Sequence, residues 1–204
     1  MGISKTLHMQ SVLRIEFTET PPNKKIWIVL PVVLFFLFSC ASTQKSKGES
    51  GNAEFYNNRG MANDKEGLYD QAISDYNKAL EIDPKYAEAY NNRGVVYRRK
   101  GQYDRAISDY NKALEINPRD AEAYNNRGVA YSIKGQYDRA ISDYSQAVEI
   151  NQRFAEGYYG RGICYYYQKQ YDKSWGDINK AQGLGLTIPP QFLDDLRRAS
   201  GREK

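Results

Sequence analysis

The sequence predicts an all-α solenoid built from four helix-turn-helix units, and two observations lead to this fold class. One pattern recurs every 34 residues without insertions, beginning at Ala53, Ala87, Ala121 and Ala155. Within each unit, apolar and small residues fall on two stripes at helical spacing, separated by a turn. A repeat of this period indicates units that pack on their neighbours instead of closing around one core.

The unit at 87–120 shows how each helix is predicted to begin and end. Its first stripe contains small and aromatic residues at spacings of four and three: Tyr90, Gly94 and Tyr97. A second stripe covers 106–114, and Gly101 stands between the two, where a turn is needed. Pro118 follows the second stripe, and proline ends a helix because it lacks an N–H and its ring clashes with the preceding turn.

This pattern resembles that of the tetratricopeptide repeat family, which places aromatic, small and proline residues at fixed positions of a 34-residue unit. The second unit supplies them as Tyr90, Gly94, Tyr97, Ala106, Tyr110, Ala113 and Pro118. The resemblance implies a right-handed solenoid, in which small residues let helices approach closely and aromatic rings fill the space between hairpins. Together the units cover 53–188, as 53–86, 87–120, 121–154 and 155–188.

The two terminal units depart from the pattern, as is typical of a solenoid, because one face of each lacks a neighbouring unit. Asn63 replaces an aromatic residue in the first unit, and Lys169 replaces the turn glycine in the fourth. Beyond the fourth unit, three apolar residues recur at helical spacing: Phe192, Leu193 and Leu196. We therefore expect a C-terminal capping helix within 189–204.

The first 39 residues are expected to be a leader with an apolar h-region at 26–38. Thirteen residues are too few to cross a bilayer of roughly 30 Å as a helix, which takes about 20, but they suit a signal peptide. Leu37, Ser39 and Cys40 resemble the lipobox of bacterial lipoprotein precursors. The resemblance implies cleavage before Cys40 and its lipidation. An uncleaved signal anchor, or a short hydrophobic helix that a cysteine happens to follow, is the alternative.

The location of the repeats follows from this leader. In both the lipoprotein and the signal anchor, Lys24 and Lys25 would stay inside and the repeats would be exported. Residues 40–52 form a polar tether rich in Ser, Gly and Lys. Ala41 stands where enteric lipoproteins carry the aspartate that retains them in the inner membrane, so the outer membrane is favoured over the inner. We expect a lipid-anchored protein of a bacterial cell envelope, whose translation start could lie downstream of Met1 because the leader is long.

Residues suited to catalysis are scarce. The only histidine, His8, lies in the expected leader, and Cys164 occupies a position held by Ala62, Val96 and Ala130 in the other units. Cys164 is thus expected to be a small buried hydrophobe, with a reactive or intermolecular thiol as the alternative. The sequence contains no metal-ligand spacing, phosphate-binding glycine loop or nucleophile elbow. It therefore predicts no enzyme, no metal and no cofactor.

The charge balance argues against a nucleic-acid partner. The formal charge of the whole chain is +4. Residues 40–204 alone contain 25 Lys and Arg and 23 Asp and Glu, which gives a charge of +2. A protein that follows a nucleic-acid backbone needs a stripe of cations, and this composition does not provide one.

One pair of charged residues recurs in every unit. An arginine in the first helix is followed sixteen residues later by an aspartate in the second: Arg59 and Asp75, Arg93 and Asp109, Arg127 and Asp143, Arg161 and Asp177. We predict ion pairs within or between hairpins. The alternative is solvated charge, since an exposed ion pair contributes only about 0–1 kcal/mol.

The resemblance further implies a concave groove lined by the first helices. The residues at its lining positions are Asn57, Asn58, Asn91, Asn92, Val95, Arg98, Arg99, Asn125, Asn126, Val129, Tyr159 and Tyr166. Asparagine both donates and accepts, so a series of asparagines can bond the backbone of an extended peptide. Arg98 and Arg99 would favour an acidic group. The alternative for the asparagines is that duplication copied them with the repeat.

The expected function is that of a non-catalytic adaptor that binds a protein or peptide partner in this groove. Glutamate occupies the second position of every unit, where the family members that clamp a C-terminal carboxylate carry lysine, so that activity is not expected. The alternative is a structural subunit that acts by self-association, as a homo-oligomer, or within a larger envelope assembly.

Overall fold

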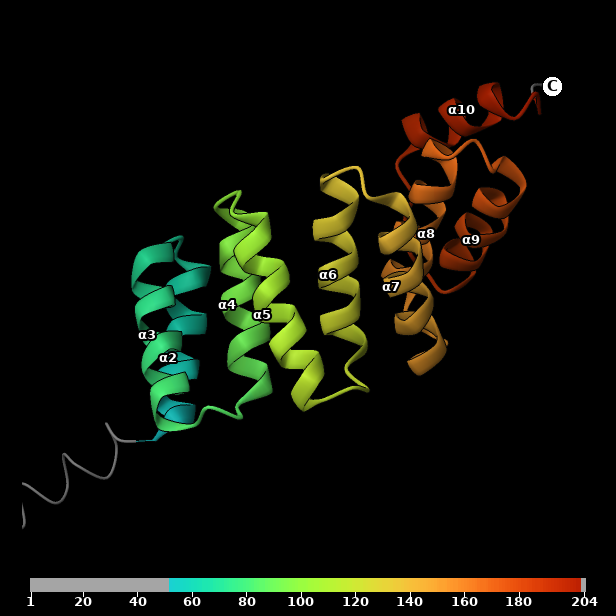
Figure 1. Ribbon diagram of the computed structural model, residues 1–204. Helices are drawn as coiled ribbons and strands as arrows, with labels where there is room; N and C mark the ends of the chain where they lie inside the picture. The colour runs from blue at the N-terminus through green and yellow to red at the C-terminus, as the bar shows by residue number, and fades with distance from the viewer. Residues whose placement is uncertain (1–51, 203–204) are drawn as a thin grey trace, which may run out of the picture. The chain divides into compact units, whose positions relative to one another are not determined.

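The computed structural model describes residues 52–202, and in this range the chain forms helices joined by turns and short connections (Figure 1). The helices pair into four hairpins: α2 (Ala53–Lys65) with α3 (Tyr69–Ile82), α4 (Ala87–Arg99) with α5 (Tyr103–Ile116), α6 (Ala121–Ile133) with α7 (Tyr137–Ile150), and α8 (Ala155–Tyr167) with α9 (Tyr171–Gly183). A last helix, α10 (Pro190–Ala199), follows them. The predicted fold class, an all-α right-handed solenoid of four helix-turn-helix units with a C-terminal capping helix, is confirmed.

The turn inside each hairpin depends on one residue with a left-handed backbone. Gly101 has a φ of 73°, and its N–H donates to the carbonyl oxygen of Arg98 at 3.0 Å, which closes the C-terminus of α4. Glycine adopts this conformation without steric cost because it has no Cβ. In the fourth hairpin Lys169 takes the same place with a φ of 61°, so the last unit keeps the turn at the expense of backbone strain.

Within each of the first three hairpins, a tyrosine ring packs directly on the backbone of the first helix. A Cβ built on Gly94 would lie 2.7 Å from Cε1 of Tyr110, a distance that atoms in contact do not reach. The rings of Tyr76, Tyr110 and Tyr144 are buried there. Glycine is therefore required on the first helix because the second helix contributes a ring at the point of closest approach.

Small residues also form the contacts between hairpins. Ala106 and Tyr110 of the second hairpin are buried against Ala130 of the third, and Tyr144 of the third is buried against Cys164 of the fourth. Cys164 is fully buried, which confirms its prediction as a small hydrophobe. Burial raises the pKa of its thiol, so the unreactive protonated form is favoured.

Helix α10 covers the last hairpin. Leu196 is fully buried in a cluster with Ile178, Ala181 and Ile188. Pro190 begins α10, a position where its fixed φ and missing N–H cost nothing. The apolar face that a fifth hairpin would otherwise bury is therefore covered by the chain itself.

Successive first helices contact one another: α2 contacts α4, α4 contacts α6, and α6 contacts α8. Each second helix contacts the first helix of the next hairpin more extensively than it contacts the next second helix. The first helices therefore lie on the inner side of the repeat array. We call the surface of α2, α4, α6 and α8 that faces away from the second helices the first-helix face.

Between Asn52 and Arg202, no helix combines the length and the apolar character that a membrane crossing requires. The predicted leader, the lipidated Cys40 and the tether up to Gly51 lie outside the described residues.

Candidate functional site

The arginine that recurs in every first helix is bonded to the second helix of its own hairpin. Arg93 donates from Nε to Oδ2 of Asp109 at 2.8 Å and from Nη2 to Oδ1 at 2.7 Å. The same two bonds join Arg59 to Asp75, Arg127 to Asp143, and Arg161 to Asp177. The predicted ion pairs are confirmed, and they form within hairpins. Two parallel bonds fix the orientation of both side chains.

From the second hairpin onward, the same guanidinium reaches the preceding hairpin. Arg93 donates from Nη1 to Oδ1 of Asn77 at 2.6 Å, and Arg161 donates from Nη1 to Oγ of Ser145 at 3.0 Å. Burial alone would lower the pKa of Arg93, but the bonds to Asp109 outweigh it and raise the pKa. These arginines therefore join three helices and are not available to a ligand.

Two of the asparagines predicted to line the groove are buried. Asn92 donates from Nδ2 to Oδ1 of Asn57 at 3.1 Å, and Asn126 donates in the same way to Asn91 at 3.1 Å. Asn57 is 0% exposed and Asn91 is 6% exposed. Both therefore hold adjacent first helices together. The predicted role of a peptide-binding ladder does not fit them, because their amides are already paired inside the array.

This series of asparagine pairs ends at the fourth unit. Tyr159 and Gly160 stand where the other units carry two asparagines. A Cβ on Gly160 would lie 2.5 Å from Cζ of Tyr144, so the ring occupies the space of the missing side chain. Asn125, half-buried on α6, consequently has no asparagine to bond, and its amide makes no hydrogen bond within the described residues.

The two adjacent arginines at the end of α4 differ. Arg99 donates from Nη1 to Oδ1 of Asp64 in the first hairpin at 2.6 Å, so its charge is paired within the chain although its side chain is 43% exposed. Arg98 is half-buried and forms no ion pair with any residue that the structure describes. Its Nε is buried without a hydrogen-bond partner, and so is the hydroxyl of Tyr110.

The side chains of Arg98 and Tyr110 are neighbours. Burial raises the pKa of Tyr110 to about 12, and the positive charge of Arg98 is the strongest effect that opposes this rise. A cation and a neutral hydroxyl therefore lie together between the second and third units. Sequence reasoning missed Tyr110, since the repeat pattern explains its ring and gives no signal for its hydroxyl.

The remaining predicted groove residues divide between the surface and the packing of the array. Asn58 is exposed on α2, whereas Val95 and Val129 are half-buried and pack against the core clusters of their hairpins. The rings of Tyr159 and Tyr166 pack against Phe192 of α10, with ring centroids 6.1 and 5.4 Å apart. These two tyrosines form an aromatic end of the first-helix face beside the capping helix.

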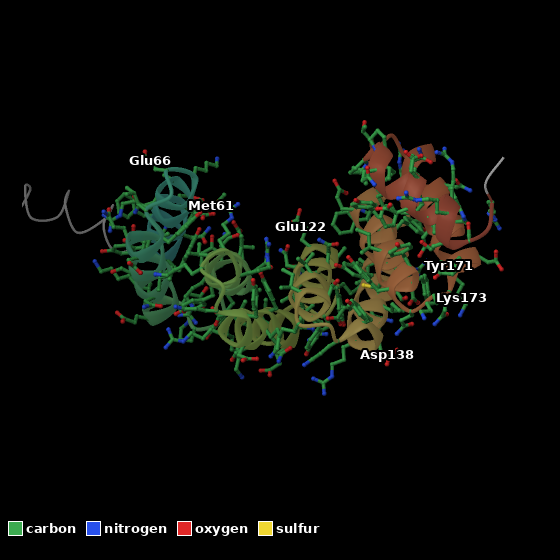
Figure 2. The ribbon with its side chains drawn as sticks, turned by 90° about the horizontal axis from the view of Figure 1, so that it is seen from above. Met61, Glu66, Glu122, Asp138, Tyr171 and Lys173 are labelled. Carbon is green, nitrogen blue, oxygen red and sulfur yellow. The ribbon has the colours of Figure 1, made fainter. Side chains whose placement is uncertain are left out.

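Two shallow hollows lie elsewhere, at the turns that precede α7 and α9. The first, of about 430 Å³, is lined by residues 135–139 and Gln168, and the second, of about 320 Å³, by residues 169–173 and Ser200. Figure 2 labels Asp138 in the first turn of α7, and Tyr171 and Lys173 in the first turn of α9. Across residues 52–202, His, Cys, Asp and Glu do not gather into a group that could hold a metal ion.

Matches to protein-family models identify the repeats. A model described as tetratricopeptide repeat matches residues 87–120 and 121–154, and a further TPR repeat model matches residues 65–101. Residues 65–154 carry tetratricopeptide repeats. The search of curated protein sequences gives no match.

Solved structures share the fold. The crystal structure of MamA is 26% identical, with 70% of this chain and 83% of that chain covered and a TM-score of 0.63. PilF of Pseudomonas aeruginosa is 24% identical, with coverages of 76% and 72% and a TM-score of 0.68, a likeness that shows the fold alone. The first TPR domain of Spaghetti (RPAP3), bound to the HSP90 peptide SRMEEVD, is 27% identical, with coverages of 57% and 93% and a TM-score of 0.56. Proteins with this fold generally mediate protein–protein interactions.

Proposed function

We propose that this chain is a non-catalytic adaptor that binds a protein or peptide on its first-helix face and is held at a bacterial envelope by a lipid on Cys40. The observation that carries the binding role is the inner surface formed by four successive first helices, where Asn58, Arg98 and Asn125 keep polar groups that are not paired with other side chains of the array. The solved TPR domain with a bound peptide supports this role. Solenoids of stacked repeats use such surfaces for binding.

The anchoring role rests on the sequence alone. Leu37, Ser39 and Cys40 follow an apolar stretch of signal-peptide length, and a polar segment separates Cys40 from the first repeat. An acylated cysteine joined to the repeats by such a tether would hold the partner near the membrane and raise its local concentration there.

Site-specific crosslinking tests the binding role. A photoreactive residue at Asn58, on the first-helix face, should capture a partner, whereas the same residue at Ser108, exposed on the second helix α5, should not. The captured protein is then purified, and its affinity for the full-length chain is measured by calorimetry. Equal capture from both positions, or a purified partner that does not bind, would remove the role of this face.

Intact mass of the membrane-extracted chain tests the anchor. We expect a chain that begins at Cys40 and carries the added mass of acyl groups, and we expect Cys40→Ser to lose both the mass and the membrane fraction. Cys164→Ala is the matched control, since Ala130 is buried at the same position of the third unit, and it should keep the lipid. An unprocessed wild-type chain would contradict the lipoprotein assignment.

One observation favours self-association as a second function. Phe55 is 40% exposed at the first hairpin, at the position where Ala89 and Ala123 are buried against a preceding hairpin. An exposed aromatic ring on an end face suits contact with a second copy. Sedimentation of wild-type chain and Phe55→Ser at increasing concentration would test it, and identical monomeric behaviour of both would exclude it.

A further inference from the structure

The three arginines of helix α4 are unequal in how the chain neutralises their charge. Arg93 is bonded to Asp109 and Asn77, and Arg99 is bonded to Asp64. Arg98, on the same helix, is the arginine of α4 for which the described residues supply no counter-charge. A guanidinium has five N–H donors in a fixed fork. A carboxylate is the ligand group whose charge and geometry complement a half-buried guanidinium that has no acceptor.

We propose that Arg98 binds the side-chain carboxylate of an aspartate or glutamate in an extended segment of the partner, an inference that rests on the proposed function of the first-helix face. The terminal nitrogens of Arg98 are not among the buried unpaired atoms, so they reach solvent and are open to a ligand. Its Nε is buried, so the two terminal nitrogens are the atoms that can make two parallel bonds to a carboxylate.

Tyr110 acts in this site as a positioning residue. Its hydroxyl is buried beside the guanidinium and has no other partner in the described part of the chain. Like any tyrosine it is a neutral hydroxyl at physiological pH, and burial extends this state by raising its pKa to about 12. When a ligand carboxylate is bound, this hydroxyl can accept a hydrogen bond from Arg98 and hold the fork toward the ligand without adding charge.

The surroundings of Arg98 favour a side chain of the partner over its C-terminus. Arg98 belongs to the second of four units, and the face continues to Asn58 on one side and to Asn125 on the other. The free amide of Asn125 can bond the backbone of a segment that runs past Arg98. A partner that ended at Arg98 would leave that amide unused.

The charges at the second position of each unit restrict where an acidic residue can lie. The glutamates there are all exposed: Glu54, Glu88, Glu122 and Glu156. Figure 2 shows Glu122 on α6, on the helix next to the one that carries Arg98. They repel a carboxylate near the start of each first helix, so an acidic residue of the partner is favoured at Arg98 over those positions.

Peptide display on the full-length chain tests this inference. Random peptides with both ends blocked by flanking sequence are selected on wild-type chain, on Arg98→Gln and on Arg99→Gln. We expect the wild-type chain and Arg99→Gln to enrich peptides with one aspartate or glutamate at a fixed place. Arg98→Gln should select peptides without this acidic residue, and Arg98→Lys should retain part of the preference because it keeps the charge.

A binding cycle with one selected peptide makes the test quantitative. Changing the acidic residue of the peptide to its amide should weaken binding to the wild-type chain about tenfold or more, the strength of a charge-assisted hydrogen bond. The same change in the peptide should not alter its affinity for the Arg98→Gln variant. Tyr110→Phe should weaken binding of the acidic peptide and leave binding of the amide peptide unchanged. A loss of structure would weaken the binding of both peptides.

The possible failures are distinguishable. If the wild-type chain selects no peptide on this face, the proposed function itself fails. If it selects peptides without an acidic preference, or if Arg98→Gln keeps that preference, the binding face stands and the role of Arg98 is overturned. A preference seen only with free C-termini would also overturn it, in favour of a terminal carboxylate.

Discussion

Helix α4 contains two arginines five residues apart, Arg93 and Arg98, whose surroundings differ. Arg93 lies in the seam between hairpins, where its fork is filled by Asp109 and by Asn77 of the preceding hairpin. Arg98 lies on the first-helix face beside Tyr110, with a buried and unpaired Nε. The seam is complete within the chain, and the face is not. Incomplete pairing in an otherwise paired array is thus what separates Arg98, the proposed ligand contact, from the structural Arg93.

The first hairpin shows the same contrast at the seam itself. The side chain of Arg59 is 45% exposed, whereas the equivalent side chains of Arg93 and Arg127 are 18% and 19% exposed. Among the described residues no hairpin precedes that of Arg59, although its bonds to Asp75 are present. The Arg–Asp pair within a hairpin therefore forms wherever the hairpin lies in the array. The burial of its arginine depends on contact with a preceding hairpin.

The largest effect is expected from breaking the seam. Asp109→Ala should lower the free energy of unfolding by about 3–5 kcal/mol, because Arg93 would be left largely buried without its carboxylate. Asp104→Ala is the control, since Asp104 is 87% exposed and its pair with Lys134 should contribute about 0–1 kcal/mol. Urea unfolding measures both. Equal losses in the two variants would show that the seam is worth no more than surface charge.

The buried hydroxyl beside Arg98 predicts a pH dependence. The pKa of Tyr110 is about 10 when unfolded and about 12 when folded, so between these values the unfolded state releases a proton that the folded state keeps. This contribution to stability is therefore complete below pH 10 and is lost as the pH rises to 12, at about 1.4 kcal/mol per pH unit.

Tyr110→Phe removes the hydroxyl that titrates, so comparing the variant with the wild-type chain isolates its contribution to stability. It should leave stability at neutral pH equal or slightly higher, because it also removes an unpaired buried hydroxyl. Above pH 10 its stability should fall less steeply than that of the wild-type chain. Denaturant unfolding across pH 8 to 12 measures the two slopes. Parallel slopes would mean that Tyr110 titrates normally.

Gly94 lies between Arg93 and Arg98 in the sequence, and its substitution tests how closely the ring of Tyr110 packs on α4. Gly94→Ala should cost about 1–3 kcal/mol, because the added Cβ would lie 2.7 Å from the ring of Tyr110. Gly176 in α9 is the matched control, since a Cβ there meets no atom within 4 Å. Gly176→Ala should stabilise the chain by about 0.5–1 kcal/mol through better helix propensity. A change of the same sign in both variants would contradict the close packing.

The repeated features of this molecule could be predicted from sequence, and the departures from the repeat could not be fully interpreted. The hairpins, the turn at Gly101, the burial of Cys164 and the Arg–Asp pairs follow from residues that recur at one spacing. Arg98 and Arg99 are identical neighbours in the sequence, and only the structure shows that Arg99 reaches Asp64 of the preceding hairpin. Successive residues of a helix point about 100° apart, and the distance to the next helix decides which of them finds a partner.

The asparagines teach the same lesson about polar residues. Their recurrence could indicate a ladder for a ligand or a contact between helices, and both uses need an amide at the same spacing. The substitution of Asn by Gly160 was visible in the sequence. Its consequence for Asn125 depends on the pairing of Asn126 with Asn91, which links adjacent units and could not be read from one unit alone.

The smallest effect on stability is expected at Arg98, and it is the most informative. Arg98→Gln should change the free energy of unfolding by no more than about 0.5 kcal/mol, because the side chain makes no bond in the array that would be lost. Arg93→Gln, five residues earlier, should lose several times more, since it leaves Asp109 buried without its partner. Urea unfolding of both variants measures the ratio. A loss at Arg98 as large as that at Arg93 would mean that Arg98 belongs to the structural seam, and the contrast between the two regions would disappear.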